Sequence, residues 1–177
     1  VDPDLCVSCG ICVGACPTAT PFRTKGELVP GIDLPSQTAS ELRESIHKVS
    51  ETFDGKGRAL AFACRGSRDA KRLKAAGEPV VEVECMGQVP PSFFDYVLSR
   101  KHADGIFLAG CTDQGCHYRL GSDWTLQRIG RTRDPRLRKR IDASAIEMHW
   151  TDSPDGTVLS RLQAFNSTLA KNAGEQA

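Results

Sequence analysis

Cysteines at the ends of three predicted strands could form a metal site. The strands are mainly apolar runs at residues 59–63, 80–84 and 106–109. The cysteines that follow them are Cys64, Cys85, Cys111 and Cys116. In an open parallel sheet the carboxyl ends of the strands meet at one edge, where ligands bind. These four thiols can therefore converge although they are far apart in the sequence, and four converging thiolates make a metal site.

A second set of cysteines lies near the start of the chain and has the spacing C-x2-C-x2-C-x3-C-P. Its members are Cys6, Cys9, Cys12 and Cys16, and Pro17 closes the pattern. This spacing is typical of cysteines that ligate 4Fe-4S clusters. Small residues between the thiols let the backbone wrap tightly around a cluster. Zinc usually pairs two C-x2-C knuckles across a longer gap, so the pattern favours an iron-sulfur cluster over zinc.

The composition is that of a globular chain that uses cysteine for metal or redox chemistry. Of the 177 residues, 40% are hydrophobic and 25% are charged, which is ordinary for a folded domain. Eight cysteines without secretory features indicate a reducing compartment. No apolar run has the roughly 20 residues of a membrane-spanning helix. We therefore expect a cytoplasmic location, alone or attached to a membrane-bound complex. Because the chain starts at Val1 without a signal peptide, we also expect it to be part of a longer protein.

The middle of the chain is locally basic, most strongly from Arg131 to Arg140. No base-reading motif accompanies this charge, so we do not expect nucleic acid as a partner. One interpretation is a solvated loop followed by a short helix that begins at Asp134 and Pro135. The alternative is a docking surface for an acidic protein partner.

The elements that must position the cysteines alternate between strand and helix, which is typical of an α/β protein with a parallel sheet. Residues 21–37 are rich in proline and glycine and predict an irregular connector. Thr38 and Glu41 fit a capping box that opens a helix. Further helices are predicted after Ser67, from Pro90 through Leu98, and from Asp123 to Ile129. A fourth strand is predicted at 145–150, and Ser153 with Pro154 should cap a closing helix.

The order of the strands follows from their burial. The first and third strands are apolar throughout and should be central, whereas Val81 and Val83 alternate with Glu82 and Glu84 as in an edge strand. This pattern predicts an open parallel four-stranded sheet of order 2-1-3-4, flanked by helices. The predicted organisation is a ferredoxin-type module and connector at 1–36, a bridging helix at 37–57 and a second cysteine-containing domain at 58–177.

The N-terminal pattern resembles the second half of a two-cluster bacterial ferredoxin module. The resemblance rests on residues 2–17 together with Thr18 and Ala19. In such modules the fourth cysteine of the run ligates the other cluster. The resemblance therefore implies that Cys16 serves a second cluster and that Cys6, Cys9 and Cys12 take a fourth thiolate from outside this chain. In the alternative, all four cysteines hold one cluster.

The remaining residues resemble the delta subunit of methyl-viologen-reducing hydrogenase over residues 58–170. The resemblance is carried by Cys64 and by the segments 83–89, 103–111 and 115–121. It implies a 2Fe-2S cluster on Cys64, Cys85, Cys111 and Cys116. It also implies electron transfer between a hydrogenase or formate dehydrogenase and the flavin of a heterodisulfide-reductase-like subunit. Family members often begin this domain with C-x2-C, whereas Ser67 takes the place of the second thiol here.

Other side chains near the second cysteine set could tune a cluster. Arg65, His117 and Arg119 are the nearest candidates, because positive charge and hydrogen bonds near the sulfurs raise a reduction potential. His117 is not expected to be a ligand, since Rieske-type sites replace two cysteines with two histidines. Trp124 and Trp150 are expected in the core.

Three classes of function are compatible with the eight cysteines. They are an iron-sulfur electron-transfer subunit, a zinc-stabilised interaction module and a thiol-disulfide enzyme that uses Cys111 and Cys116. The last lacks a C-x-x-C pair at a helix N-terminus. A flavodoxin-like FMN carrier would need a phosphate-binding loop after the first strand, where Cys64, Arg65 and Gly66 stand instead. No nucleophile, base and orienting residue can be grouped, so we expect no catalytic site of the chain's own.

Overall fold

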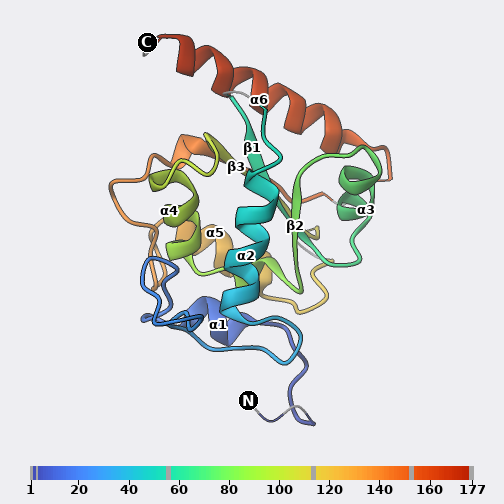
Figure 1. Ribbon diagram of the computed structural model, residues 1–177. Coiled ribbons are helices and arrows are strands. Elements are labelled where there is room, and N and C mark those ends of the chain that lie inside the picture. The colour runs from blue at the N-terminus through green and yellow to red at the C-terminus, as the bar shows by residue number, and fades with distance from the viewer. Residues whose placement is uncertain (1, 3, 55–56, 113–114, 152–153, 176–177) are drawn as a thin grey trace.

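A four-stranded parallel sheet forms the centre of the molecule (Figure 1). The computed structural model describes residues 2, 4–54, 57–112, 115–151 and 154–175. The strands β1 (Ala59–Cys64), β2 (Val80–Val83), β3 (Gly105–Ala109) and β4 (Ile146–His149) lie in the order β2-β1-β3-β4. All three neighbouring pairs are parallel. The predicted α/β class and strand order are therefore confirmed.

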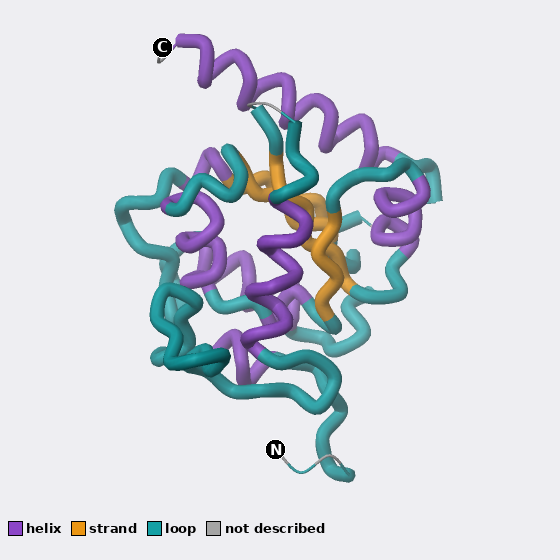
Figure 2. Tube along the Cα trace, viewed as in Figure 1, coloured by secondary structure: helices purple, strands orange, loops and turns teal. Residues whose placement is uncertain are grey.

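Helices cover both faces of this sheet. In chain order the helices are α1 (Ile11–Ala15), α2 (Ala39–Ser50), α3 (Arg68–Ala75), α4 (Pro91–Ser99), α5 (Gly121–Ile129) and α6 (Thr157–Glu175). Two short 3-10 turns, η1 (Met86–Gln88) and η2 (Ala143–Ala145), complete the set. Residues 17–38 run as an extended loop without a strand, as the prolines and glycines predicted (Figure 2).

The alternation of side chains along β1 divides the core into two halves. Leu60, Phe62 and Cys64 pack with residues of α2 and α4 on one face of the sheet. Ala59, Ala61 and Ala63 pack with α3 and α6 on the other face. The small alanines leave room for Leu73, Phe107, Val158 and Leu162. Both faces of β1 are buried, which is why its sequence is apolar throughout.

Local capping explains where two of the helices begin. The Thr38 hydroxyl accepts a hydrogen bond from the amide of Glu41 (3.1 Å), and the Glu41 carboxylate accepts from the amide of Thr38 (2.7 Å). Ser67 caps α3 by accepting from the amide of Ala70 (3.1 Å). Both caps were predicted. The predicted closing helix is present as α6. Ser153, one of the two residues predicted to cap it, lies outside the described residues.

The segment 131–140 differs from the predicted solvated loop and short helix. No helix begins at Asp134 or Pro135, and the described chain between α5 and η2 is a loop. The Arg131 guanidinium holds this loop by donating to the carbonyls of Leu137 (3.3 Å) and Ile141 (2.8 Å). These carbonyls accept hydrogen bonds from a side chain and not from the backbone amides of a helix. Tertiary contacts therefore override the helix-start signal of Asp134 and Pro135.

Trp124 and Trp150, which were expected in the core, are only half-buried. The Trp124 ring is covered by two guanidinium groups, with Arg133 at 4.1 Å and Arg128 at 5.8 Å from its centroid. The Trp150 ring lies against Gly110 at the end of β3. Both rings therefore pack at the margin of the core, where one edge remains exposed.

A cluster of aromatic and imidazole rings joins α2 to α4. His47 contacts the Tyr96 hydroxyl at 2.9 Å, and the rings of His47 and His102 lie 4.6 Å apart. The pKa of each histidine is lowered by burial. The positive charge of Arg43 lowers the pKa of His47 further. The charges of His47, Arg43 and Arg100 lower the pKa of His102 further. The cluster therefore holds two neutral imidazoles next to arginines.

Acid should weaken the fold through this cluster. A histidine whose pKa is lower in the folded than in the unfolded protein binds fewer protons when folded. Its contribution to stability is complete above the unfolded pKa near 6.5 and falls as the pH drops below that value. We expect the melting temperature to fall between about pH 7 and pH 5, and less so in a His47→Gln/His102→Gln variant. Parallel losses in both proteins would contradict this account.

Candidate metal centre

The carboxyl ends of the strands bring the second cysteine set to one edge of the sheet. Cys64 at the end of β1 lies beside Val83 of β2, two residues before Cys85. Ala63 lies beside Ala109 of β3, two residues before Cys111. A cavity of about 400 Å3 at this edge is lined by Cys64, Arg65, Gly66, Ser67, Glu84, Cys85, Cys111, Cys116, His117 and Tyr118. The convergence that the strands predicted is thus present for all four thiols.

The four thiols interact with one another at this cavity. Cys64 forms a hydrogen bond with Cys111, and Cys85 forms one with Cys116. Within the described residues, no three or more histidine, cysteine or carboxylate side chains are arranged to hold a single metal ion. In a 2Fe-2S cluster the four cysteines are divided between two irons, whereas one zinc ion takes all four. Four cysteine thiols at one cavity suit either a 2Fe-2S cluster or one tetrahedral zinc ion.

The environment of these thiols opposes their ionisation. The hydrogen bond with Cys111 and burial raise the pKa of Cys64 far above its usual range. Burial raises the pKa of Cys85 to about 12, and the neighbouring Cys116 and Cys111 add to the effect. Thiolates at this edge therefore need a compensating positive charge, which iron would supply.

Backbone groups of η1 point at the sulfurs. The amide of Met86 donates to the Cys64 sulfur and the amide of Gly87 donates to the Cys85 sulfur. Hydrogen bonds of this kind stabilise negative charge on cluster sulfurs. The turn after Cys85 is thus part of the site, although no single residue in it carries a charge.

Gly121, the first residue of α5, closes one side of the site. A Cβ at this position would collide with the sulfur of Cys85 and would lie 3.4 Å from that of Cys116. A Cβ on Gly87 would lie 3.0 Å from the Cα of Gly121. The absence of side chains at both positions lets α5 and η1 approach the thiols closely.

Of the three residues expected to tune a cluster, two line the cavity and one does not. Arg65 lines the cavity and pairs with Glu84, which offsets its charge. His117 lines the cavity and packs edge-on against Tyr118, with ring centroids 4.8 Å apart. Arg119 is exposed and does not belong to the cavity wall. Arg65 and His117 therefore remain candidates for tuning.

The N-terminal cysteines lie on a loop and on the short helix α1. Gly10 takes a left-handed conformation (φ 72°) before α1 begins. The Cys6 sulfur accepts a hydrogen bond from the amide of Ser8 (3.3 Å), and the Cys16 thiol lies 3.2 Å from the Thr18 hydroxyl. All four thiols are exposed or half-buried, and, as in the second set, no three of them are arranged to hold a single metal ion in the described structure.

The two cysteine sets are joined through η1. A Cβ on Gly10 would collide with Gln88, and a Cβ on Gly14 would collide with the carbonyl of Gly87. The helix α1 therefore lies directly on the turn that follows Cys85. Burial raises the pKa of Tyr118, and the nearby acidic groups of Glu84, Cys85 and Cys9 raise it further. Tyr118 thus lies within electrostatic range of both sets.

Arg128 supports this contact from the other side and was not anticipated from the sequence. Its side chain is 1% exposed, and its guanidinium donates to the carbonyl of Gly87 (3.0 Å). Burial lowers its pKa, and the nearby Arg133 lowers it further. A buried arginine that binds one backbone carbonyl has no signature in a single sequence. The glycines at 87 and 121, next to the cysteines, were the only local signal.

Comparison with known proteins places both parts of the chain. The family described as "Methyl-viologen-reducing hydrogenase, delta subunit" matches residues 60–171, and the family described as "4Fe-4S binding domain" matches residues 1–21. An iron-sulfur subunit of the F420-non-reducing hydrogenase of Archaeoglobus profundus is 28% identical over 93 residues, which is 52% of this chain and 67% of that protein. An iron-sulfur subunit of the vhc F420-non-reducing hydrogenase of Methanococcus voltae is 27% identical over 105 residues, or 54% and 72%.

None of the helices in the described ranges is long and apolar enough to cross a membrane.

The close approach of Gly121 to the sulfurs leads to a prediction. In a Gly121→Ala variant the new methyl group must displace Cys85 or α5, so we expect the affinity for the metal centre to fall about tenfold or more. Iron and sulfide content and visible absorption after anaerobic purification measure this loss. Gly174→Ala is the matched control, because a Cβ there has nothing within 4 Å. Full occupancy in Gly121→Ala would show that the site tolerates the added group.

Proposed function

The chain belongs to the family of the delta subunit of methyl-viologen-reducing hydrogenase, and we propose that it is an iron-sulfur electron-transfer subunit of a hydrogenase-type complex. One observation carries the proposal. Four thiols line a single cavity, and the 4Fe-4S motif packs against the turn that follows Cys85. Contact between the elements that carry the two cysteine sets is what an electron relay needs.

We propose that Cys64, Cys85, Cys111 and Cys116 hold a 2Fe-2S cluster. When bound, such a group accepts and returns single electrons. The chain's own contribution is to bind, orient and shield it. The amides of Met86 and Gly87 donate to two of the sulfurs, and Gly121 lets α5 cover the site from one side. Arg65 and His117 line the remaining wall and can adjust the potential.

We propose that Cys6, Cys9 and Cys12 hold a 4Fe-4S cluster, which the family match at residues 1–21 supports. Cys16 either completes this cluster or serves another one. We also propose a ferredoxin-type module and connector at 1–36, a bridging helix at 37–57 and a 2Fe-2S domain at 58–177. The bridging helix α2 packs Leu42 and Ile46 into the main core, so the three parts are not separated by packing.

The proposed partners are redox subunits. The matched relatives are named as hydrogenase subunits, which supports a hydrogenase-type donor or acceptor. We further propose that a formate dehydrogenase can take the place of the hydrogenase. The second partner in the relay would be a flavin-containing heterodisulfide-reductase-like subunit. A cytoplasmic location, with or without attachment to a membrane-bound complex, is part of it. The alternative is a zinc-stabilised interaction module; it is less well supported, because the matched relatives are named as iron-sulfur subunits.

The nature of the second metal centre can be tested by spectroscopy. We expect Mössbauer and EPR spectra of the anaerobically purified chain to contain a 2Fe-2S component besides the 4Fe-4S signal. That component should persist in a Cys6→Ser/Cys9→Ser/Cys12→Ser variant and disappear in a Cys64→Ser/Cys111→Ser variant. A folded protein that holds zinc in place of the 2Fe-2S component would rule out this assignment.

The relay can be tested in the assembled complex. We expect Cys111→Ser or Cys116→Ser to abolish electron flow through the whole complex, because the path would lose one of its two cofactors. The half-reactions of the partner subunits with artificial dyes should remain intact, which controls for assembly. If coupled turnover survives the loss of the 2Fe-2S cluster, the domain is a structural adaptor and not a relay.

A further inference from the structure

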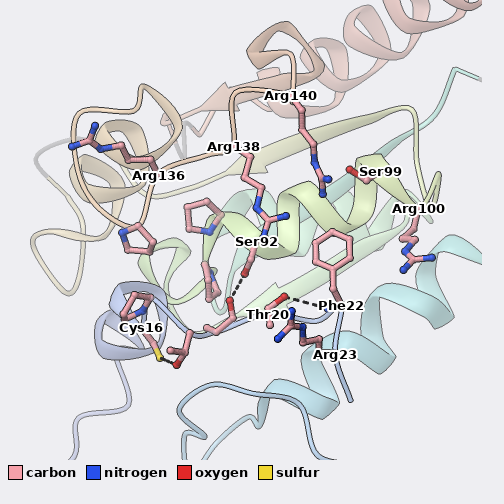
Figure 3. Close-up of a pocket in the computed structure, with 16 residues that line it drawn as sticks. Cys16, Thr20, Phe22, Arg23, Ser92, Ser99, Arg100, Arg136, Arg138 and Arg140 are labelled. Carbon is pink, nitrogen blue, oxygen red and sulfur yellow. Dashed lines mark hydrogen bonds between the residues drawn. The ribbon is translucent and has the colours of Figure 1, made fainter. Parts of the chain in front are cut away.

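A second cavity, of about 650 Å3, opens between the N-terminal segment, α4 and the segment 131–140 (Figure 3). Its wall includes Cys16 and Phe22 from the N-terminal segment, and Ser92 and Ser99 from α4. It is separate from the cavity at the ends of the strands, since the two share no lining residue. Cys16 is the one proposed cluster ligand in this wall, and the electron-transfer function proposed above assigns no role to the arginines of the cavity.

Arginines surround the Phe22 ring in this cavity. The guanidinium carbons of Arg100, Arg138 and Arg140 lie 5.8, 5.7 and 5.6 Å from the ring centroid. Arg23 lines the same space. Figure 3 shows Arg138 and Arg140 reaching toward Phe22 from the segment above it, while Arg100 approaches from the end of α4. An aromatic face attracts such cations and helps to hold them in one place.

These positive charges are only partly neutralised. Asp95, which is fully buried, accepts from Arg140 at 2.8 and 2.9 Å and lies 3.4 Å from Arg138. A fifth lining arginine, Arg136, pairs with Asp134 at 3.1 Å. In the described part of the chain, Asp95 is thus the one carboxylate that pairs with any of the three arginines around Phe22 or with the nearby Arg23. The excess of positive charge around one cavity favours the binding of an anion.

The neutral groups of the wall are already engaged. Ser92 donates to the carbonyl of Ala19 (2.7 Å), and Ser99 donates to Asp95 (2.6 Å). The Phe22 ring packs edge-on against Tyr96, with centroids 5.3 Å apart, and has arginines around it. The Thr18 hydroxyl lies 3.2 Å from the Cys16 thiol and the Thr20 hydroxyl accepts from the amide of Phe22 (3.3 Å), so the described wall offers few free hydroxyls and no open aromatic face for a base or a sugar. A ligand here would be recognised by its charge.

We propose that this cavity binds an anion that carries a diphosphate group. The planar fork of a guanidinium matches the oxygens of a phosphoryl group, and several forks fit two linked groups better than one. The volume lies in the range of small-molecule sites. Asp95 and Phe22 fix the arginines before a ligand arrives, which lowers the entropic cost of binding. The diphosphate can belong to a free nucleotide or to a dinucleotide. The base and sugar of either molecule should contribute little to the affinity.

Calorimetric titration of the purified chain tests the site. Inorganic pyrophosphate should bind, orthophosphate should bind about tenfold or more weakly, and added salt should weaken both. ADP and FAD should bind about as tightly as pyrophosphate. Arg23→Gln and Arg100→Gln should each weaken pyrophosphate binding about tenfold or more, since each removes a charge-assisted contact. These variants leave the pairs with Asp95 intact. Arg161→Gln, which removes a positive charge from α6, should leave the affinity unchanged.

Several results would overturn the proposal. The first is that pyrophosphate does not bind. The second is that Arg23→Gln and Arg100→Gln bind pyrophosphate as tightly as the unaltered protein. The third is that Arg161→Gln loses as much affinity as these two variants. A glutamate-rich peptide that binds more tightly than pyrophosphate would identify the cavity as a docking site for an acidic protein. FAD that binds far more tightly than ADP would show that a flavin is recognised and not the diphosphate alone. Arg100→Lys, which keeps the charge but loses the fork, should bind with intermediate affinity.

Discussion

The contacts of Gly87 hold both cysteine sets in place. Its amide donates to the Cys85 sulfur, and its carbonyl accepts from the buried Arg128. Its Cα faces Gly121 on one side, and its carbonyl faces Gly14 on the other. A residue with a side chain at any of these glycines would push α1, η1 and α5 apart. The metal centre is therefore built around a backbone contact, and the cysteines are positioned by it.

This arrangement explains why an arginine is buried where no carboxylate pairs with it in the described structure. Removing a guanidinium from water is costly, and its Nε has no hydrogen-bond partner among the described residues. In return, Arg128 fixes the carbonyl of Gly87 and stacks on Trp124, which holds η1 against α5. Its positive charge also lies behind the turn that carries Cys85. A negative cluster at that edge would offset part of the cost of burying the arginine.

The strands that carry the cysteines could be predicted from the sequence, but the contacts between the elements around the site could not. The strands at Ala59–Cys64 and Gly105–Ala109 were predictable because both of their faces are buried, so their residues are apolar throughout. The alternation in Val80–Val83 revealed an edge strand for the same reason. From the strand ends, the convergence of the four cysteines followed. These are properties of residues that are near one another along the chain.

The packing of α1 on η1, the buried Arg128 and the loop at 131–140 depend instead on residues distant in sequence. Asp134 and Pro135 carry the helix-start signal of this segment, but the chain forms a loop in which Arg138 and Arg140 pair with the buried Asp95 of α4. A charge on one element thus decides the conformation of another, which no local pattern records. The half-buried state of Trp124 has the same origin, since Arg133 covers it from that loop.

Direct packing between the two cysteine sets has a consequence for how they can communicate. In a protein with two redox modules on a flexible linker, the distance between them varies with the linker. Here the connector at 17–38 is irregular, yet α1 is fixed by Gly10 and Gly14 against the turn after Cys85. The separation of the two sites is therefore determined by glycine contacts and not by the length of the connector. Tyr118, whose pKa reflects burial and the charges of both Cys85 and Cys9, lies where the two environments overlap. A change of charge at either site would therefore act on the same tyrosine.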